Sequence, residues 1–169
     1  MAAESSMNAG GGTMAESAEV LEFSLGSEHY ALDINIVREI VEMMPITGIP
    51  RAPVHIRGVI NLRGEIVNIV NLNTFLKLPD RPITKGQKII VLMAEVANGN
   101  NVGVIVDNVS SVSEISGSQV DYMTEGLAGN ESKYIKGIIN TAQEGQEKQE
   151  KSLIIWLDIH KMFKDIEKT

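Results

Sequence analysis

Side chains that could carry out catalysis are few in this sequence and lie far apart. The three histidines (His29, His55 and His160) form no H-x-x-x-H pair, and there is no cysteine. The nucleotide-binding and nucleophile motifs G-x-G-x-x-G, G-x-x-x-x-G-K-[ST] and G-x-S-x-G do not occur. Carboxylates are scattered, so an acid–base pair could come only from folding. The sequence therefore predicts no catalytic residue and no metal site. A small β-barrel enzyme built on carboxylates and His55 stays open as a weaker alternative.

A more informative pair of residues interrupts the apolar stretch GVINLRGEIVNIVNL, residues 58–72. Gly64 tolerates the positive φ that a tight reversal requires, so Arg63 and Gly64 can form a two-residue turn. The strands then pair Leu62 with Glu65, Asn61 with Ile66 and Ile60 with Val67. This predicts a β-hairpin with Arg63 at its tip. Its guanidinium is either simply solvated or presented to a partner, and its fork suits a carboxylate.

Length and composition are those of an ordinary soluble domain. The 169 residues are 43% hydrophobic and 22% charged, and 15 basic against 22 acidic residues leave a net charge of -7. This excess of acid, with only 4% aromatic residues, disfavours nucleic-acid binding and anionic membranes. The longest apolar run is too short for a membrane helix. Residues 1–17 lack the pattern of a signal peptide, so a cytoplasmic protein is expected. The small, polar residues of this segment predict a disordered tail.

An internal duplication organises the rest of the chain. The segment HIRGVIN, which begins at His55, recurs as YIKGIIN from Tyr134. After a turn, EIVNIVNLNTFLK from Glu65 is echoed by SLIIWLDIHKMFK from Ser152. The second of these turns is TAQEGQEKQEK, residues 141–151, a long charged excursion with no assigned role. Upstream, YALDINIVREIVEM aligns more weakly with VGVIVDNVSSVSEI.

Each half reads as short strands rich in Val and Ile, followed by one short helix. About five strands per half would make a small closed barrel, which removes unpaired strand edges. The predicted class is therefore all-β, with two five-stranded barrels and a short C-terminal helix. The first barrel is expected mainly at 18–78 and the second mainly at 87–166. Between them, residues 79–86 carry the proline and glycine typical of a linker.

The last helix and residues 33–44 allow more specific predictions. The last helix begins at the natural N-cap Asp158, and one buried face has the right spacing in Ile159, Met162, Phe163 and Ile166. Residues 33–44 fit either a helix or a strand. As a strand, this segment places Val37, Glu39 and Val41 on one face. Apolar residues on both faces then predict either a two-sided core strand or a face covered by a partner.

The stretch EFSLGSEHYALDINIVREIVE, followed by HIRGVINLRGEIVNIVNL, resembles the CheW family of bacterial chemotaxis coupling proteins. The resemblance runs from about Glu19 to Glu167, and its later motifs are V-G-V-I-V-D-N-V and Y-I-K-G. It implies two SH3-like barrels packed around a shared hydrophobic junction, with no cofactor. It also implies a non-catalytic adaptor between the regulatory domain of the histidine kinase CheA and the cytoplasmic tips of chemoreceptors. The expected location is in receptor arrays on the inner face of the membrane, without insertion into it.

The resemblance also implies receptor-binding positions in this chain. Val37 and Glu39 come from the V-x-E of VREI, Gly58 and Arg63 from G-V-I-N-L-R-G, and Val112 from the second-half segment NVSSV. These residues are expected to line one groove at the junction of the halves, with Arg63 holding an edge of it.

No such match indicates the surface that would face the kinase. Residues 43–50, MMPITGIP, are apolar and bounded by proline, so this segment is not expected to be wholly internal. Met44 and Ile46 are therefore predicted as kinase contacts from residue type, because methionine adapts well to binding surfaces. A nucleic-acid-binding barrel remains the weakest alternative.

Overall fold

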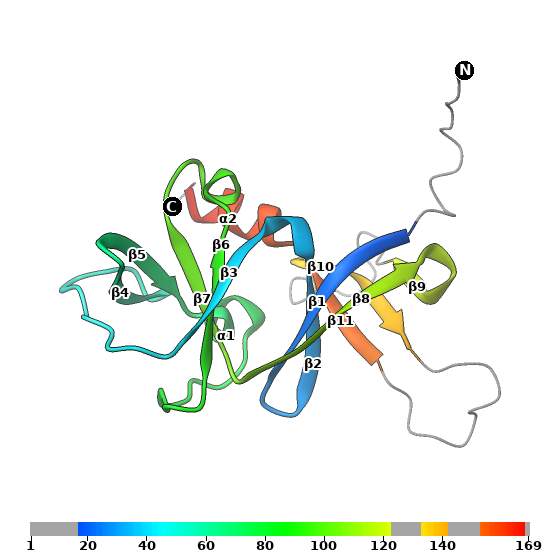
Figure 1. Cartoon of the computed structure of the whole chain (residues 1–169), viewed down its shortest axis with the longest axis horizontal. Coiled ribbons are helices and arrows are strands. Elements are labelled where there is room, and N and C mark those ends of the chain that lie inside the picture. The colour runs from blue at the N-terminus through cyan, green and yellow to red at the C-terminus, as the bar shows by residue number, and fades with distance from the viewer. Residues whose placement is uncertain (1–16, 123–132, 142–152, 168–169) are drawn as a thin grey trace.

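In a computed structural model, the chain forms two β-sheets side by side, with the C-terminal helix packed at their junction (Figure 1). The structure describes residues 17–122, 133–141 and 153–167. The predicted tail, apart from Ser17, and the charged 141–151 turn, apart from its first residue, lie outside the described residues. The elements are β1 Ser17–Leu25, β2 Glu28–Asp33, the 3₁₀ helix η3 Ile34–Ile36, β3 Val37–Glu42, β4 Ile56–Leu62, β5 Glu65–Val70, α1 Leu72–Leu76, β6 Lys88–Leu92, η4 Ala94–Ala97, β7 Val102–Val106, β8 Asn108–Ser116, η5 Gly117–Gln119, β9 Val120–Tyr122, β10 Ile135–Asn140, β11 Leu153–Leu157 and α2 Ile159–Glu167.

The strand order confirms the all-β class with a short C-terminal helix. The first sheet has five strands in the order β3-β6-β7-β5-β4, and the second has six in the order β8-β1-β2-β11-β10-β9. The second sheet exceeds the predicted five strands because the short β9 pairs with β10. At the corresponding place in the first sheet, β4 makes a single bridge between Thr47 and Val59.

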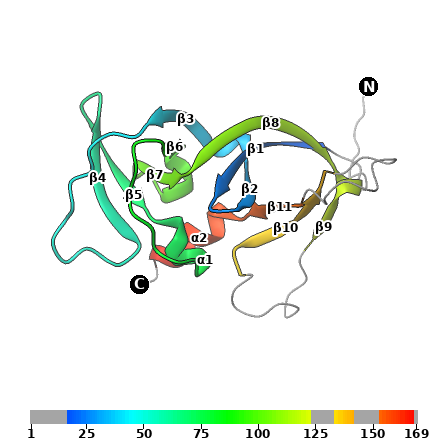
Figure 2. The same cartoon turned by 90° about the horizontal axis from the view of Figure 1, so that it is seen from below.

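The pairing of the hairpins corrects the predicted division of the chain. Strands β1 and β2 come from the first half but join β8 and β11, whereas β6 and β7 join β3 and β5. The two sheets therefore do not follow 18–78 and 87–166, because the β1–β2 and β6–β7 hairpins each pair with strands of the other half. Figure 2 shows β8 running from the first sheet across to β1 in the second. A duplicated sequence cannot reveal this exchange, because both hairpins offer similar apolar strands.

The register confirms the duplication itself. Tyr30 of β2 lies opposite Ile155, and its counterpart Val102 of β7 lies opposite Asn68, both in parallel pairs. Irregularities fall at matching places, between Ile56 and Gly58 in β4 and between Ile135 and Gly137 in β10. The backbone hydrogen bonds that begin the helices also match, from Asn71 to His55 at 2.8 Å and from Asp158 to Tyr134 at 2.7 Å.

The β4–β5 hairpin has the predicted register, with Leu62 opposite Glu65, Asn61 opposite Ile66 and Ile60 opposite Val67. Arg63 and Gly64 form the turn with positive φ angles of 51° and 91°. This is the backbone handedness that two-residue hairpin turns require. The side-chain oxygen of Asn61 accepts a hydrogen bond from the backbone N–H of Gly64 at 2.8 Å, which fixes the turn.

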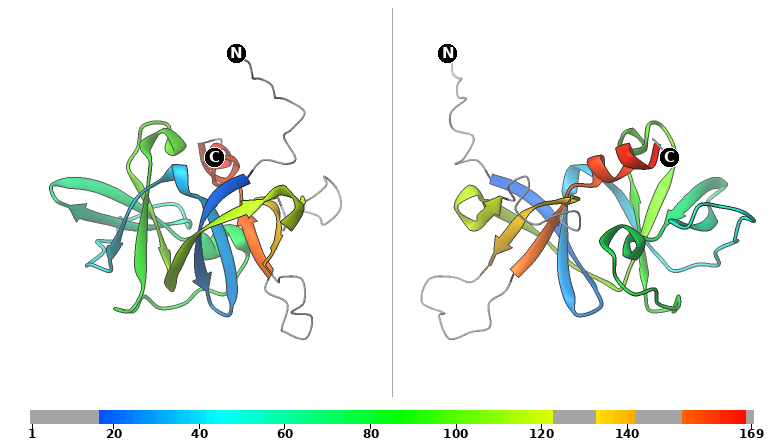
Figure 3. Two further views of the ribbon diagram at one scale, coloured as in Figure 1. Left: turned by 45° about the vertical axis from the view of Figure 1, so that its right-hand side comes forward. Right: turned by 180° about the vertical axis from the view of Figure 1, so that it is seen from behind.

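A shared apolar core joins the two sheets, as the family resemblance implied. It takes buried residues from both sheets and from α2, among them Phe23, Leu32, Val104 and Met162. The predicted α2 is confirmed: Asp158 accepts a hydrogen bond from the Lys161 N–H at 3.1 Å, and Ile159, Met162 and Phe163 are buried. Burial of each such side chain contributes roughly 1.5–3 kcal/mol. Figure 3 shows α2 lying beside the first sheet, although it follows a strand of the second.

Candidate functional site

The segment at residues 33–44 resolves into the 3₁₀ helix η3 and the strand β3, which is the edge strand of the first sheet. Its side chains alternate as predicted: Val37, Glu39 and Val41 are half-buried, and the residues between them are exposed. Ile40 on the outer face is 41% exposed. The interpretation of β3 as a two-sided core strand is therefore wrong, and its outer face is open.

Arg63 reaches from the hairpin tip to β3 and pairs with Glu39. Its Nη2 donates to both carboxylate oxygens of Glu39, at 2.8 and 2.6 Å. The Arg63 side chain stays 64% exposed, while that of Glu39 is 26% exposed. Arg63 is therefore not simply solvated, because its Nη2 is bound to Glu39. It instead ties the two edges of the first sheet, β3 and the β4–β5 hairpin.

Two residues that the sequence did not single out extend this ion-pair network. Arg38 Nη2 donates to Glu65 Oε1 at 2.9 Å and lies 3.3 Å from Glu39 Oε2. Glu65 follows the turn directly, so Arg38 and Arg63 link β3 to both sides of the hairpin tip. The only signal in the sequence was alternating charge in VREI and LRGE, which does not reveal a pair so distant along the chain.

The network favours the charged forms of Glu39 and Arg38. The hydrogen bond from Arg63 lowers the pKa of Glu39 below its usual value, against the opposing effect of partial burial. The hydrogen bond to Glu65 raises the pKa of Arg38. Pairs this exposed contribute little to stability and weaken with salt. Their effect is to hold charges of both signs in a fixed arrangement on an open surface.

Gly58 is buried in β4, where the backbone of residues 46–47 lies very close to it. Its φ is 149°, and a Cβ there would lie 2.3 Å from the carbonyl oxygen of Thr47 and 2.8 Å from Ile46 Cγ2. Thr47 makes two backbone hydrogen bonds to Val59, both 2.9 Å long. Gly58 thus allows the 46–47 segment to lie close to β4, and a side chain at this position would displace that segment.

Of the remaining predicted receptor-binding residues, Val37 lies on β3 beside the ion pairs, whereas Val112 lies on the second sheet. Val37 begins β3 and packs against the shared core, as does Val109 at the start of β8. Val112 lies on β8, opposite Leu21, and is 50% exposed. It belongs to the second sheet, whereas Glu39 and Arg63 belong to the first. Val112 and the Glu39–Arg63 pair are related by the internal duplication, because β3 and β8 are equivalent edge strands of the two sheets.

Met44 and Ile46, predicted as kinase contacts, are half-buried. Both pack against the core of the first sheet, around Ile60 and Val67. The segment is thus not wholly internal, as expected. The next apolar residue, Ile49, is 45% exposed and is the more accessible of the set.

His55 lies in an aromatic cluster. Its ring is 5.5 Å from that of Phe75, which is 5.7 Å from the ring of Tyr134. Burial lowers the pKa of His55. Within the described ranges, no group of three or more His, Asp or Glu side chains could hold a metal ion. Neither helix in the same part of the chain has the length and hydropathy needed to cross a membrane.

Comparisons with known proteins identify the family of this chain. Residues 19–167 match the family model described as CheW-like domain. The curated relative "Chemotaxis protein CheW" from Treponema pallidum is 32% identical over 88% of this chain and 83% of its own length. The protein of the same name from Thermotoga maritima is 31% identical, over 88% and 89%. The crystal structure of the scaffolding protein TtCheW from Thermoanaerobacter tengcongensis superposes with a TM-score of 0.69 at 30% identity, covering 84% of this chain and 89% of that one.

Proposed function

This chain belongs to the CheW-like family, and from this we propose that it is a non-catalytic adaptor that couples the histidine kinase CheA to the cytoplasmic tips of chemoreceptors. Family membership over nearly the whole described chain supports the adaptor role in chemotaxis. The observation that carries the proposal further is the Glu39–Arg63 pair, which holds fixed charges at an open sheet edge. A surface whose charges are already ordered in this way suits the binding of a partner protein.

The proposed receptor face comprises Val37, Glu39, Gly58, Arg63 and Val112. Charges already paired within the protein need little reordering when a partner binds, which lowers the entropic cost of association. Val112 supplies an exposed apolar side chain on the equivalent edge of the second sheet. A receptor tip that contacts both edges would bury apolar surface and meet a charged rim, as protein interfaces commonly do.

The proposed kinase face is the segment around Met44 and Ile46, with Ile49 as its exposed member. This segment lies at the end of the first sheet's core. The regulatory domain of CheA would bury these side chains. Each buried aliphatic side chain would then contribute roughly 1.5–3 kcal/mol before the costs of association.

Calorimetry with the purified chain, the regulatory domain of its cognate CheA and a receptor cytoplasmic fragment tests the proposal. We expect saturable binding to both. Arg63→Ala should weaken receptor binding only, and Ile46→Asp should abolish kinase binding only. Because Ile46 packs on the core, Ile49→Asp provides a second kinase-face variant that leaves the core intact.

Arg51→Ala is the matched control for Arg63→Ala. Both are exposed arginines with a left-handed backbone, at φ 64° and 51°, so both substitutions cause similar backbone strain. Receptor binding should survive in Arg51→Ala. If neither partner binds at high micromolar concentration, the coupling function is wrong. If Arg63→Ala and Arg51→Ala have equal receptor affinity, the assignment of Arg63 to the receptor face fails.

A further inference from the structure

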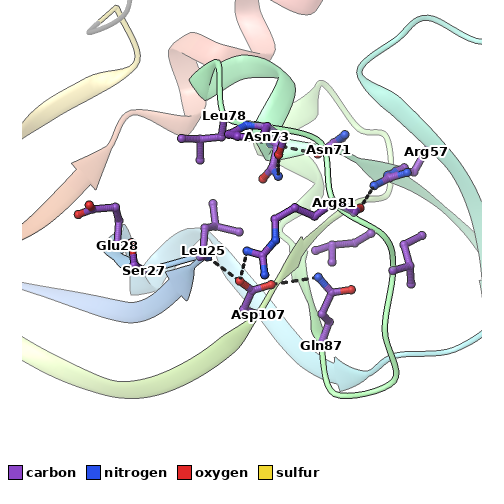
Figure 4. A pocket seen from close by; sticks show the side chains of 14 residues that line it. Leu25, Ser27, Glu28, Arg57, Asn71, Asn73, Leu78, Arg81, Gln87 and Asp107 are labelled. Atoms are coloured by element: carbon purple, nitrogen blue, oxygen red, sulfur yellow. Dashed lines mark hydrogen bonds and ion pairs between the residues drawn. The ribbon is translucent and has the colours of Figure 1, made fainter.

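A pocket of about 340 Å³ lies where the two sheets meet, away from the Glu39–Arg63 pair. It is lined by the β1–β2 turn of the second sheet, by residues of the first sheet and by the segment that joins α1 to β6 (Figure 4). We name this segment, residues 78–87, the strap. Its Arg81 extends through the pocket toward Asp107, which stands between β7 of the first sheet and β8 of the second.

Asp107 gathers three separate segments of the chain. Its Oδ2 accepts hydrogen bonds from the Gly26 N–H at 2.6 Å and from Arg81 Nη1 at 2.9 Å. Its Oδ1 accepts one from Gln87 Nε2 at 3.0 Å. Its own backbone N–H donates to the carbonyl oxygen of Ser24 at 2.9 Å. The β1–β2 hairpin, the strap and the crossover between the sheets are thereby joined at one carboxylate.

The Asp107 carboxylate is surrounded by hydrogen-bond donors that favour its charged form. Partial burial raises the pKa of Asp107, but the hydrogen bonds from Gln87, Gly26 and Arg81 together outweigh it, so the pKa lies below its usual value. The Asp107 side chain is only 22% exposed, compared with 49% for Arg81. Hydrogen bonds to a charged acceptor are roughly twice as strong as neutral ones.

The strap is also held on its other side. Arg57 of β4 donates from Nη2 to the carbonyl oxygen of Arg81 at 2.8 Å and lies 3.2 Å from Asp80 Oδ1. Asn73 of α1 donates from Nδ2 to the carbonyl oxygen of Pro79 at 2.8 Å. The strap is therefore anchored to the first sheet by Arg57 and to α1 by Asn73. Through Arg81 it reaches the Asp107 carboxylate, which also binds the β1–β2 hairpin of the second sheet.

We propose that Asp107, with Arg81 and the strap, is a clasp that sets the orientation of the two sheets and thereby positions the β3 and β8 edges for a partner that contacts both. Asp107 is in this sense a positioning residue. Because β8 begins at Asn108, directly after the clasp, a change at Asp107 alters where Val112 stands relative to the first sheet. The functional part of this inference rests on the proposed receptor binding.

The orientation of the sheets can be measured without any partner. The chain has no cysteine, so spin labels can be placed at Ile66→Cys and Leu153→Cys alone. These equivalent positions on β5 and β11 are 56% and 46% exposed. Pulsed dipolar spectroscopy then gives the distance distribution between the sheets. We expect Asp107→Ala to broaden it and Glu42→Gln to leave it unchanged, since the Lys88–Glu42 pair joins neighbours within the first sheet.

Binding by unlabelled variants completes the test. If the sheet orientation that binds the receptor falls to about a tenth of the population in Asp107→Ala, receptor affinity falls about tenfold. Affinity for the kinase domain should not change, because its proposed contacts belong to the first sheet alone. A general loss of stability would not lower receptor affinity while leaving kinase affinity unchanged. If Asp107→Ala does not fold, Arg81→Gln removes one contact of the clasp and should show the same effects in smaller size.

The outcomes are distinguishable. An unchanged distance distribution in a folded variant overturns the clasp. A broadened distribution with unchanged receptor affinity overturns its positioning role. Failure of the wild-type chain to bind receptor rejects the proposed function, while the distance measurement still decides whether the clasp exists.

Discussion

Replacement of Gly58 by alanine should destabilise the protein far more than its small size suggests. At φ 149° the backbone is in a region that only glycine adopts readily, and strain there costs about 1–3 kcal/mol. The new Cβ would also lie 2.3 Å from the carbonyl oxygen of Thr47, which is rigid backbone held by hydrogen bonds. Displacement of that segment adds about 1–3 kcal/mol. The expected loss is therefore about 2–6 kcal/mol, a large part of a typical total of about 5–15 kcal/mol.

Three other glycines separate the two contributions. Gly64→Ala carries the strain alone, because its φ is 91° but no heavy atom lies within 4 Å of the added Cβ. Gly137→Ala, the equivalent position in the repeat, carries the close contact alone, with Asp121 O at 3.0 Å. Gly48→Ala carries neither, and its free energy of unfolding should stay within about 0.5 kcal/mol of wild type. We expect Gly58→Ala to exceed both single-effect variants.

Urea unfolding provides the assay. Trp156 is the only tryptophan and is buried in the core of the second sheet, so its fluorescence follows that sheet, while circular dichroism follows both. Coincident transitions would justify a two-state free energy. If Gly58→Ala is as stable as Gly48→Ala, the close approach of Thr47 does not constrain the protein and the reasoning is refuted. If instead Gly58→Ala keeps its stability but loses receptor binding, the effect of Gly58 on the receptor face does not arise from destabilisation.

Three further predictions concern ionisation and assembly. The pKa of Glu39, measured by NMR titration, should rise toward its usual value in Arg63→Ala. Because this pKa is lowered in the folded protein, the pair stabilises the fold at neutral pH, and this stabilisation is lost as the pH falls through the pKa of Glu39. A pKa that does not change in Arg63→Ala would disprove the pairing. Burial and the hydrogen bond to Asp165 raise the pKa of Tyr134 to about 12. The free energy of unfolding should therefore fall as the pH rises from about 10 toward that value. Urea titrations at each pH should show that Tyr134→Phe abolishes this part of the loss of stability at alkaline pH. Fragments 1–78 and 87–169 should each lack strand structure by circular dichroism, because each sheet draws strands from both, and independent folding of either fragment would contradict the exchanged pairing.

Local features of this protein were readable from its sequence. The β4–β5 register followed from the Arg63–Gly64 turn, because a two-residue turn determines which residues face each other. The α2 helix followed from the Asp158 cap and its apolar spacing. The duplication followed from matching segments, and the all-β class followed from short runs rich in Val and Ile. All of these depend on interactions between residues close in the chain or on a repeated pattern.

Contacts between distant residues were decided by the tertiary structure alone. The pattern could not tell that β1 and β2 join β8 and β11, because two similar hairpins compete for the same places. Glu39 and Arg63 were each predicted to face a partner, but the fold brings them together across 24 positions. The clasp joins Gly26 to Asp107 across 81 positions. No local preference encodes such pairs, since they form only when the packing of two whole sheets around one core brings their backbones together.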